Sequence, residues 1–158
     1  VRTTVPSVHE MGYYCERLTG QVYAGLKQVG IRPLSPELIL YHSDEYREEE
    51  VEVEAAVAVH PKYLTHLPIE EKIGFRELPG HNLVASLIYE GPFSDMIPAV
   101  LALLSWVGQH RHIPVGPLRE LHLSGPVHAP DMADADLVTE LQIPIAPIGQ
   151  NPDIKHEA

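Results

Sequence analysis

Apolar side chains recur at three- and four-residue steps in two parts of the chain. The first repeat predicts an amphipathic helix over about residues 8–29. Ser7 and Glu10 form a capping-box sequence at its start, and Gly30 is a natural C-terminal stop. The second repeat predicts a helix that is capped by Ser94 and ends near His110. The stripes consist of Met11, Tyr14, Leu18, Val22 and Leu26, and of Met96, Val100, Leu103, Leu104 and Val107.

Alternation of apolar and polar residues predicts the strands. They cover about residues 37–42, 51–59, 73–78, 83–89, 118–123 and 136–145. Together with the helices they give the order strand, helix, strand, strand, and this order occurs twice. The opening strand of the first copy is nearly absent, since only Val1 to Val5 precede Pro6.

The two copies also agree position by position. Aligned without gaps, Glu54 falls on Glu140, and Tyr41 falls on His122. We therefore expect an α+β fold of two tandem strand–helix–strand–strand modules with pseudo-twofold symmetry. Its antiparallel sheets would carry the helices on one face and enclose a central ligand groove. The single domain 1–158 divides into a first module 1–59, a crossover 60–72, a second module 73–147 and a tail 148–158, with the first strand of module one missing.

The strand alternation also predicts which side chains face the helices. The predicted helix-facing set is aliphatic, namely Leu38, Leu40, Val53, Ala55, Val57, Leu121, Leu123, Leu141 and Ile143. The predicted opposite face carries Ile39, Tyr41, Glu54, His122, Glu140 and Gln142. Pairing of the two copies would then line a groove with aromatic rings and two carboxylates.

Such a groove suits a lipophilic cation, because a carboxylate supplies charge and ring faces add cation–π attraction. The alternative is that this face is wet and that Glu54 and Glu140 are solvated or paired with Arg or Lys. Glu140 is the better ligand candidate of the two, since Glu54 follows the acidic run of Glu48, Glu49, Glu50 and Glu52.

Composition narrows the class of protein. A chain of 158 residues can build one core without disulfides or metal. Its net charge of -11 argues against direct nucleic-acid binding and favours neutral or cationic ligands. The single Cys15 favours a reducing compartment, and no apolar run reaches the ~18 residues of a membrane span. We expect a cytoplasmic protein.

Other motifs carry less chemistry. His110-Arg111-His112 has no third ligand in register for a metal, and Asp131, Asp134 and Asp136 lack calcium-loop spacing. Cys15 and Trp106 are expected to pack in the core. No phosphate loop, dinucleotide fingerprint or nucleophile elbow occurs. We therefore expect no cofactor, no metal and no assigned catalytic residue.

Six short motifs, in this order, make the chain resemble the GyrI-like effector-binding domain. That domain is the ligand-sensing part of many MerR- and AraC-type multidrug transcription regulators. The motifs are Thr4-Val5-Pro6-Ser7, Tyr41-His42 before Glu45-Tyr46-Arg47-Glu48, Arg76-Glu77-Leu78-Pro79, Tyr89-Glu90-Gly91-Pro92-Phe93, Pro117-Leu118-Arg119-Glu120 and Thr139-Glu140-Leu141-Gln142-Ile143-Pro144.

The resemblance implies two fused modules around a central pocket. It also implies that Glu140 anchors drug-like or cationic ligands, while Tyr14, Tyr41, Tyr89 and Phe93 stack on them. His122 stands where the family often has Tyr, so the pocket would be more polar or pH-sensitive.

Three functions follow, in order of preference. The first is a sensor that binds a small hydrophobic or cationic molecule and acts on DNA only through a fused or upstream domain. The second is a hydrolase of reactive small molecules in which Glu140 activates water. The third is a protein-binding, gyrase-inhibitor-like module. A homodimer is compatible with each of them.

Overall fold

The computed structural model describes residues 1–43, 46–70, 72–124 and 137–149. Both predicted helices are present, as α1 (Met11–Gln28), preceded by the 3-10 turn η1 (Val8–Glu10), and α2 (Ile97–Gln109). Ser7 caps the turn η1 that leads into α1, since its hydroxyl accepts a hydrogen bond from the backbone N–H of His9 at 3.3 Å, and α1 itself has no side-chain cap. The prediction that Ser94 caps the second helix was wrong. The turn η3 (Phe93–Asp95) precedes α2, and the Ser94 hydroxyl donates to Asp95.

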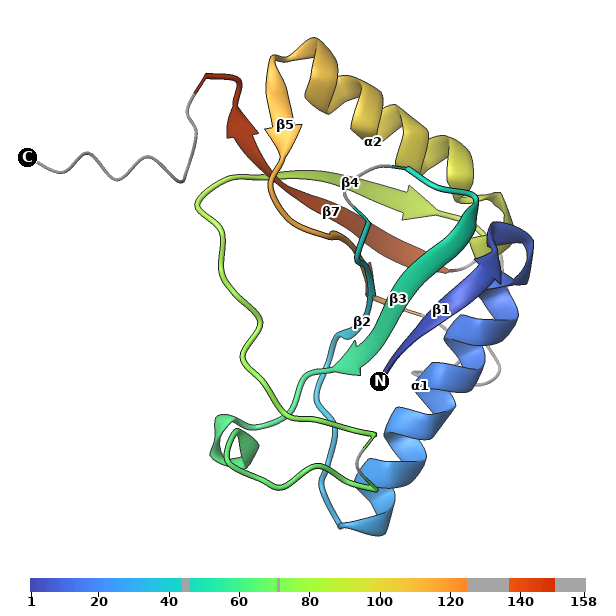
Figure 1. Ribbon diagram of the computed structural model, residues 1–158, viewed down its shortest axis with the longest axis vertical. Helices are drawn as coiled ribbons and strands as arrows, with labels where there is room; N and C mark the ends of the chain where they lie inside the picture. The colour runs from blue at the N-terminus through green and yellow to red at the C-terminus, as the bar shows by residue number, and fades with distance from the viewer. Residues whose placement is uncertain (44–45, 71, 125–136, 150–158) are drawn as a thin grey trace, which may run out of the picture.

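The strands form one antiparallel sheet in the order β1-β3-β2-β6-β7-β4, with β5 paired to β7 at its end (Figure 1). Five of the six predicted strands are present, with boundaries shifted by one or two residues. The sixth, at 73–78, is absent, and only Ile73 makes an isolated bridge, to Ile69. The elements are β1 (Arg2–Ser7), β2 (Glu37–Tyr41), β3 (Glu49–Val57), the turn η2 (Pro61–Tyr63), β4 (Val84–Glu90), β5 (His112–Pro114), β6 (Leu118–His122) and β7 (Val138–Pro147).

The strand–helix–strand–strand order occurs twice, as predicted, with one unpredicted short strand, β5, between α2 and β6. The first copy supplies β1, β3 and β2, the second supplies β4, β7 and β6, and the central strands β2 and β6 join the two. The prediction that the first module lacks its opening strand was wrong, because β1 pairs with β3 from Arg2 to Ser7. Pro6 is tolerated there because β1 is an edge strand. The three aspartates from Asp131 to Asp136 and most of the predicted tail lie outside the described residues.

The strand register corrects the predicted facing of the two central strands. Ile39 lies opposite both Ala55 and Glu120, and Glu120 lies opposite Leu141. Paired residues of antiparallel strands point to the same side of a sheet, so these four share the helix-covered face. Val53, Ala55, Val57, Leu141 and Ile143 face the helices as predicted, whereas Leu38, Leu40 and Leu121 point away from them. Ile39, Tyr41 and His122 therefore lie on the helix side, opposite to the prediction.

Each helix covers its own half of the sheet, and two apolar cores result (Figure 1). Under α1, Leu18, Val22 and Leu26 pack against β1, β2 and β3, and Ile69 and Ile73 close the far end. Under α2, Leu103 and Val107 pack against β4 and β7. The predicted burial of Trp106 was wrong. Its side chain is 47% exposed and stacks on His110 with 4.0 Å between the ring centroids.

The connection that leads to β4 crosses the face of the sheet without helices. There the Arg119 guanidinium donates to the Pro79 carbonyl at 3.3 Å. Leu40, on the same side as Arg119, is only 1% exposed. Both faces of the central strands are thus largely shielded from water.

We predict that Leu141→Ala lowers the free energy of unfolding by about 2–5 kcal/mol, because Leu141 is fully buried in the second core. The matched control is Leu101→Ala on the exposed side of α2, for which a change below about 0.5 kcal/mol is expected. Urea denaturation measures both. Equal losses in the two variants would contradict this description of the second core.

Candidate functional site

Polar side chains occupy the helix-covered face where the two modules meet. Glu37 and Tyr41 come from β2, and Glu120 and His122 come from β6. They share one side because the register places Glu37 opposite His122 and Tyr41 opposite Leu118. Glu37 and Glu120 are only 2% and 4% exposed. Burying two carboxyl groups is costly unless partners compensate them, so their surroundings decide the chemistry of the site.

The partners form a continuous chain across the module junction. The Tyr23 hydroxyl of α1 donates to Glu37 Oε1 at 2.6 Å, and the Tyr41 hydroxyl donates to Glu120 Oε1. Between the two acids, His122 Nδ1 lies 3.6 Å from Glu37 Oε2, and His122 Nε2 lies 3.5 Å from Glu120 Oε2. We name Tyr23, Glu37, His122, Glu120 and Tyr41 the central acidic cluster.

Aromatic and polar neighbours adjoin this cluster. The Phe93 ring of η3 stacks on the His122 imidazole with 4.7 Å between centroids, and Phe93 remains 36% exposed. Thr139 of β7 lies opposite His122 and is fully buried. Within the described part of the chain its hydroxyl has no hydrogen-bond partner. The cluster therefore reaches solvent on the side of Phe93. Thr139 adds a polar atom beside His122.

The electrostatics favour a cationic His122. Burial alone would lower its pKa, but the hydrogen bonds and charges of Glu120 and Glu37 outweigh burial and raise the pKa to about 9. Burial and the neighbouring Glu120 hold the pKa of Tyr41 well above its usual value, and burial raises the pKa of Cys15 to about 12. Tyr41 and Cys15 therefore stay protonated at neutral pH, while His122 carries a positive charge between two acids.

The structure places the sequence-predicted ligand residues in three different surroundings. Tyr41 and His122 belong to the central acidic cluster, and Phe93 lies against it. Ile39 and Tyr14 pack in or against the first core, and Tyr89 packs against the second. The Tyr89 hydroxyl donates to the Pro92 carbonyl at 3.0 Å. Glu54 and Glu140 lie on the helix-free face, away from the cluster, because Glu54 pairs with Leu40 and Glu140 with Leu121.

Polar partners hold both of those acids on the helix-free face. Glu140 Oε1 accepts hydrogen bonds from Ser86 at 2.7 Å and Gln142 at 3.0 Å. Arg76 donates to Glu54 at 2.8 and 3.2 Å, which confirms the alternative of pairing with Arg for that residue. Burial alone would raise the pKa of Glu54, but the hydrogen bonds from Arg76 and His42 lower it.

The sequence reasoning missed Glu37, Glu120 and Tyr23. Glu37 and Glu120 were assigned to strands, but neither was recognised as an inward-facing acid. The signal that could have found them is their parity. Glu120 lies two residues from His122, and Glu37 lies four residues from Tyr41, so each acid shares a strand face with its neighbour.

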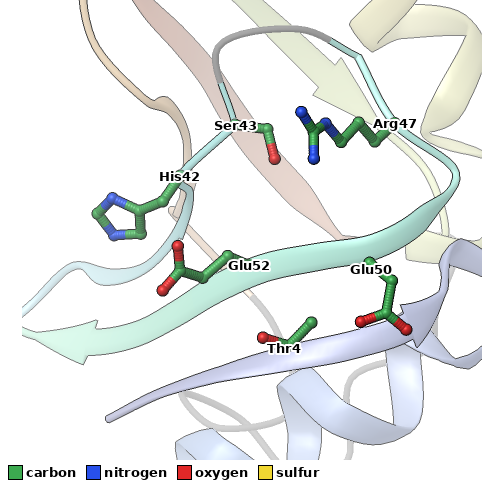
Figure 2. Close-up of a pocket in the computed structure, with 6 residues that line it drawn as sticks. All are labelled: Thr4, His42, Ser43, Arg47, Glu50 and Glu52. Carbon is green, nitrogen blue, oxygen red and sulfur yellow. The ribbon is translucent and has the colours of Figure 1, made fainter.

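A separate hollow of about 410 Å³ lies on the helix-free side, between β1, β3 and the chain that follows β2 (Figure 2). It is lined by Thr4, His42, Ser43, Arg47, Glu50 and Glu52. It therefore shares no residue with the central acidic cluster. Among the described residues, no group of three or more His, Cys, Asp or Glu is arranged to hold a metal ion. None of the described helices has the length and apolarity needed to cross a membrane.

Comparison with protein families decides the identity of this fold. The GyrI-like small molecule binding domain family matches residues 1–146, nearly the whole chain. The chain belongs to this family. No curated protein sequence matches this GyrI-like domain.

Two solved structures have a similar fold. The crystal structure of the EcmrR C-terminal domain is 25% identical to this GyrI-like domain, with a TM-score of 0.71 over 93% of this chain and 89% of that one. The cryo-EM structure of the EcmrR–DNA complex is 22% identical, with a TM-score of 0.72 over 93% of this chain. The GyrI-like domain spans 52% of that second chain.

The charge of His122 predicts a pH dependence of stability. Its folded pKa of about 9 lies above the ordinary value of 6.5, so its contribution is complete below about pH 6.5 and is lost as pH rises through about 9. We expect the unfolding free energy to fall by on the order of 3 kcal/mol over this range. His122→Gln should remove that fall. Urea denaturation across pH measures it, and an equal fall in both proteins would refute the cationic His122.

Proposed function

We propose that this domain senses a lipophilic, cationic small molecule and that the ligand binds at the central acidic cluster. The observation that carries the proposal is the buried chain from Tyr23 to Tyr41, in which two carboxyl groups surround one imidazole. Burying such a set of polar and charged groups is costly, and titratable groups with shifted pKa values, such as His122, are enriched at functional sites. The family of the chain is consistent with this reading.

Charge and aromaticity favour a cationic ligand. Two carboxyl groups face a single imidazole, so ionisation of both acids leaves one negative charge in excess. Phe93 presents an aromatic face at the solvent side of the cluster. A flat or aromatic cation that stacked on the Phe93 ring beside the two acids would receive charge compensation from the acids. It would also receive cation–π attraction from the ring. The net charge of -11 further attracts cations to the molecule.

The position of the cluster suits a sensor. Glu37 comes from the first module and Glu120 from the second, so one ligand would contact both halves of the sheet. A ligand shifts an equilibrium only if it interacts differently with two arrangements, and a site at a junction can do so. We propose that this domain biases an attached DNA-binding domain in a cytoplasmic transcription regulator. The similarity to EcmrR, solved in complex with DNA, supports that role.

The alternative anchor for the ligand is Glu140, on the other face of the sheet. The resemblance to the family favoured it, and its carboxylate has Ser86 and Gln142 as orienting neighbours. Glu120 is the stronger proposal because it is more deeply buried and lies beside aromatic groups. The two anchors lie on opposite faces of the sheet, so substitution separates them.

We predict that Glu120→Gln weakens binding of tetraphenylphosphonium, a permanent aromatic cation, by at least about tenfold, because the variant loses one of the two carboxylates whose charge attracts the cation in a shielded site. Glu140→Gln is the matched control and should bind as the unmodified domain does. Isothermal titration calorimetry of the three proteins measures the difference. A loss confined to Glu140→Gln would move the site to the helix-free face, and no binding by the unmodified domain would refute a site for aromatic cations.

A further inference from the structure

The central acidic cluster already contains a cation. Each ring nitrogen of His122 faces a carboxyl group from a different module, Nδ1 toward Glu37 at 3.6 Å and Nε2 toward Glu120 at 3.5 Å. The Phe93 ring covers one face of the imidazole. The groups that would compensate a cationic ligand are therefore the groups that now compensate His122.

We infer that His122 is the internal counter-ion of the ligand site, and that an organic cation binds there by releasing the proton that His122 carries. This inference rests on the proposed function and specifies how the site selects charge. Two positive charges in one shielded site repel each other strongly, since the protein interior screens them less than water does. Loss of the proton removes that repulsion and leaves both carboxyl groups to the ligand.

The exchange is balanced in charge and atoms. One N–H bond of the imidazolium breaks, its electron pair stays on the ring nitrogen, and the proton passes to the buffer. The arriving cation replaces the charge that departs. The net charge of the site is therefore the same before and after binding, and no other reactant is needed.

Among the described residues, the titratable side chains beside His122 other than the two acids keep their protons at neutral pH. From α1 these are Tyr23, which bonds to Glu37, and Cys15, whose thiol is near Glu120; from β2 there is Tyr41. Burial raises the pKa of all three above their usual values, so they keep their protons while His122 changes charge. The neighbours from η3 and β7, Phe93 and Thr139, do not titrate. Glu37 and Glu120 are the two acids between which the imidazole lies.

The sign of the pH effect follows from linkage. The ligand-free site holds the His122 proton below about pH 9, and the occupied site holds fewer protons. The association constant for a permanent cation should therefore rise with pH, by up to about tenfold per unit, and level off above about pH 9. A neutral ligand of similar shape does not displace the proton and should lack this dependence.

The test is calorimetry of the unmodified domain with tetraphenylphosphonium near neutral pH, in phosphate and in Tris. These buffers have very different heats of ionisation, so proton release appears as a difference in the measured binding enthalpy. We expect release of a substantial fraction of one proton with the cation, and none with neutral triphenylphosphine oxide. Because this measurement uses the unmodified domain, it does not depend on any variant folding.

Two variants complete the test. His122→Gln removes the resident charge but keeps a polar side chain, so the cation should bind at least severalfold more tightly near neutral pH, without proton release. His9→Gln, at an exposed residue of η1, is the matched control and should match the unmodified domain. Circular dichroism establishes that each variant is folded.

The outcomes separate this inference from the proposed function. Binding of the cation with equal enthalpy in both buffers and with unchanged affinity in His122→Gln would overturn the role of His122 and leave the cation site in place. No binding of the cation to the unmodified domain would overturn both.

Discussion

The pairing of β2 with β6 is the constraint on which the rest of the structure depends. It joins the two modules into one sheet, and its antiparallel register sets Glu37 against His122 and Ile39 against Glu120. Among the described strands, no other pair connects the modules. The same hydrogen bonds that close the fold therefore assemble the central acidic cluster. A shift of one residue in this register would put Glu120 and His122 on the opposite face from Glu37 and Tyr41, and the cluster would be lost.

Much of the fold follows from the sequence because its signals are local. The apolar stripe of α1, the cap at Ser7 and the alternation along β7 each depend on a few neighbouring residues. The repeated order of elements was visible for the same reason. The sequence does not predict the full length of β1, because proline disfavours a strand at Pro6. Proline is acceptable there because β1 is an edge strand that pairs only with β3.

The candidate site was harder to predict because the central strands are shielded on both faces. β2 reads Glu-Leu-Ile-Leu-Tyr, so either alternate set contains apolar residues, and alternation cannot choose between them. The connection before β4 contributes to this, since its Pro79 carbonyl accepts a hydrogen bond from Arg119, and Leu40 on the same side is buried. Only long-range register shows that Glu120 points inward and that Glu140 points away. The parity of a single strand groups Glu120 with His122, but it does not say which face of the sheet they occupy.

The shared register also makes the two ends of the junction chemically unequal. Equivalent residues close the strands, Tyr41 in β2 and His122 in β6, but the residues opposite them are Leu118 and Glu37. One end of the β2–β6 ladder is thus ionic, and the other is aliphatic and aromatic. A ligand at the proposed site would therefore meet a polarity gradient along this ladder, with its charge nearest Glu37 and Glu120 and its apolar part toward Leu118. The two modules each supply three strands to the main sheet, and these few positions give their junction a direction.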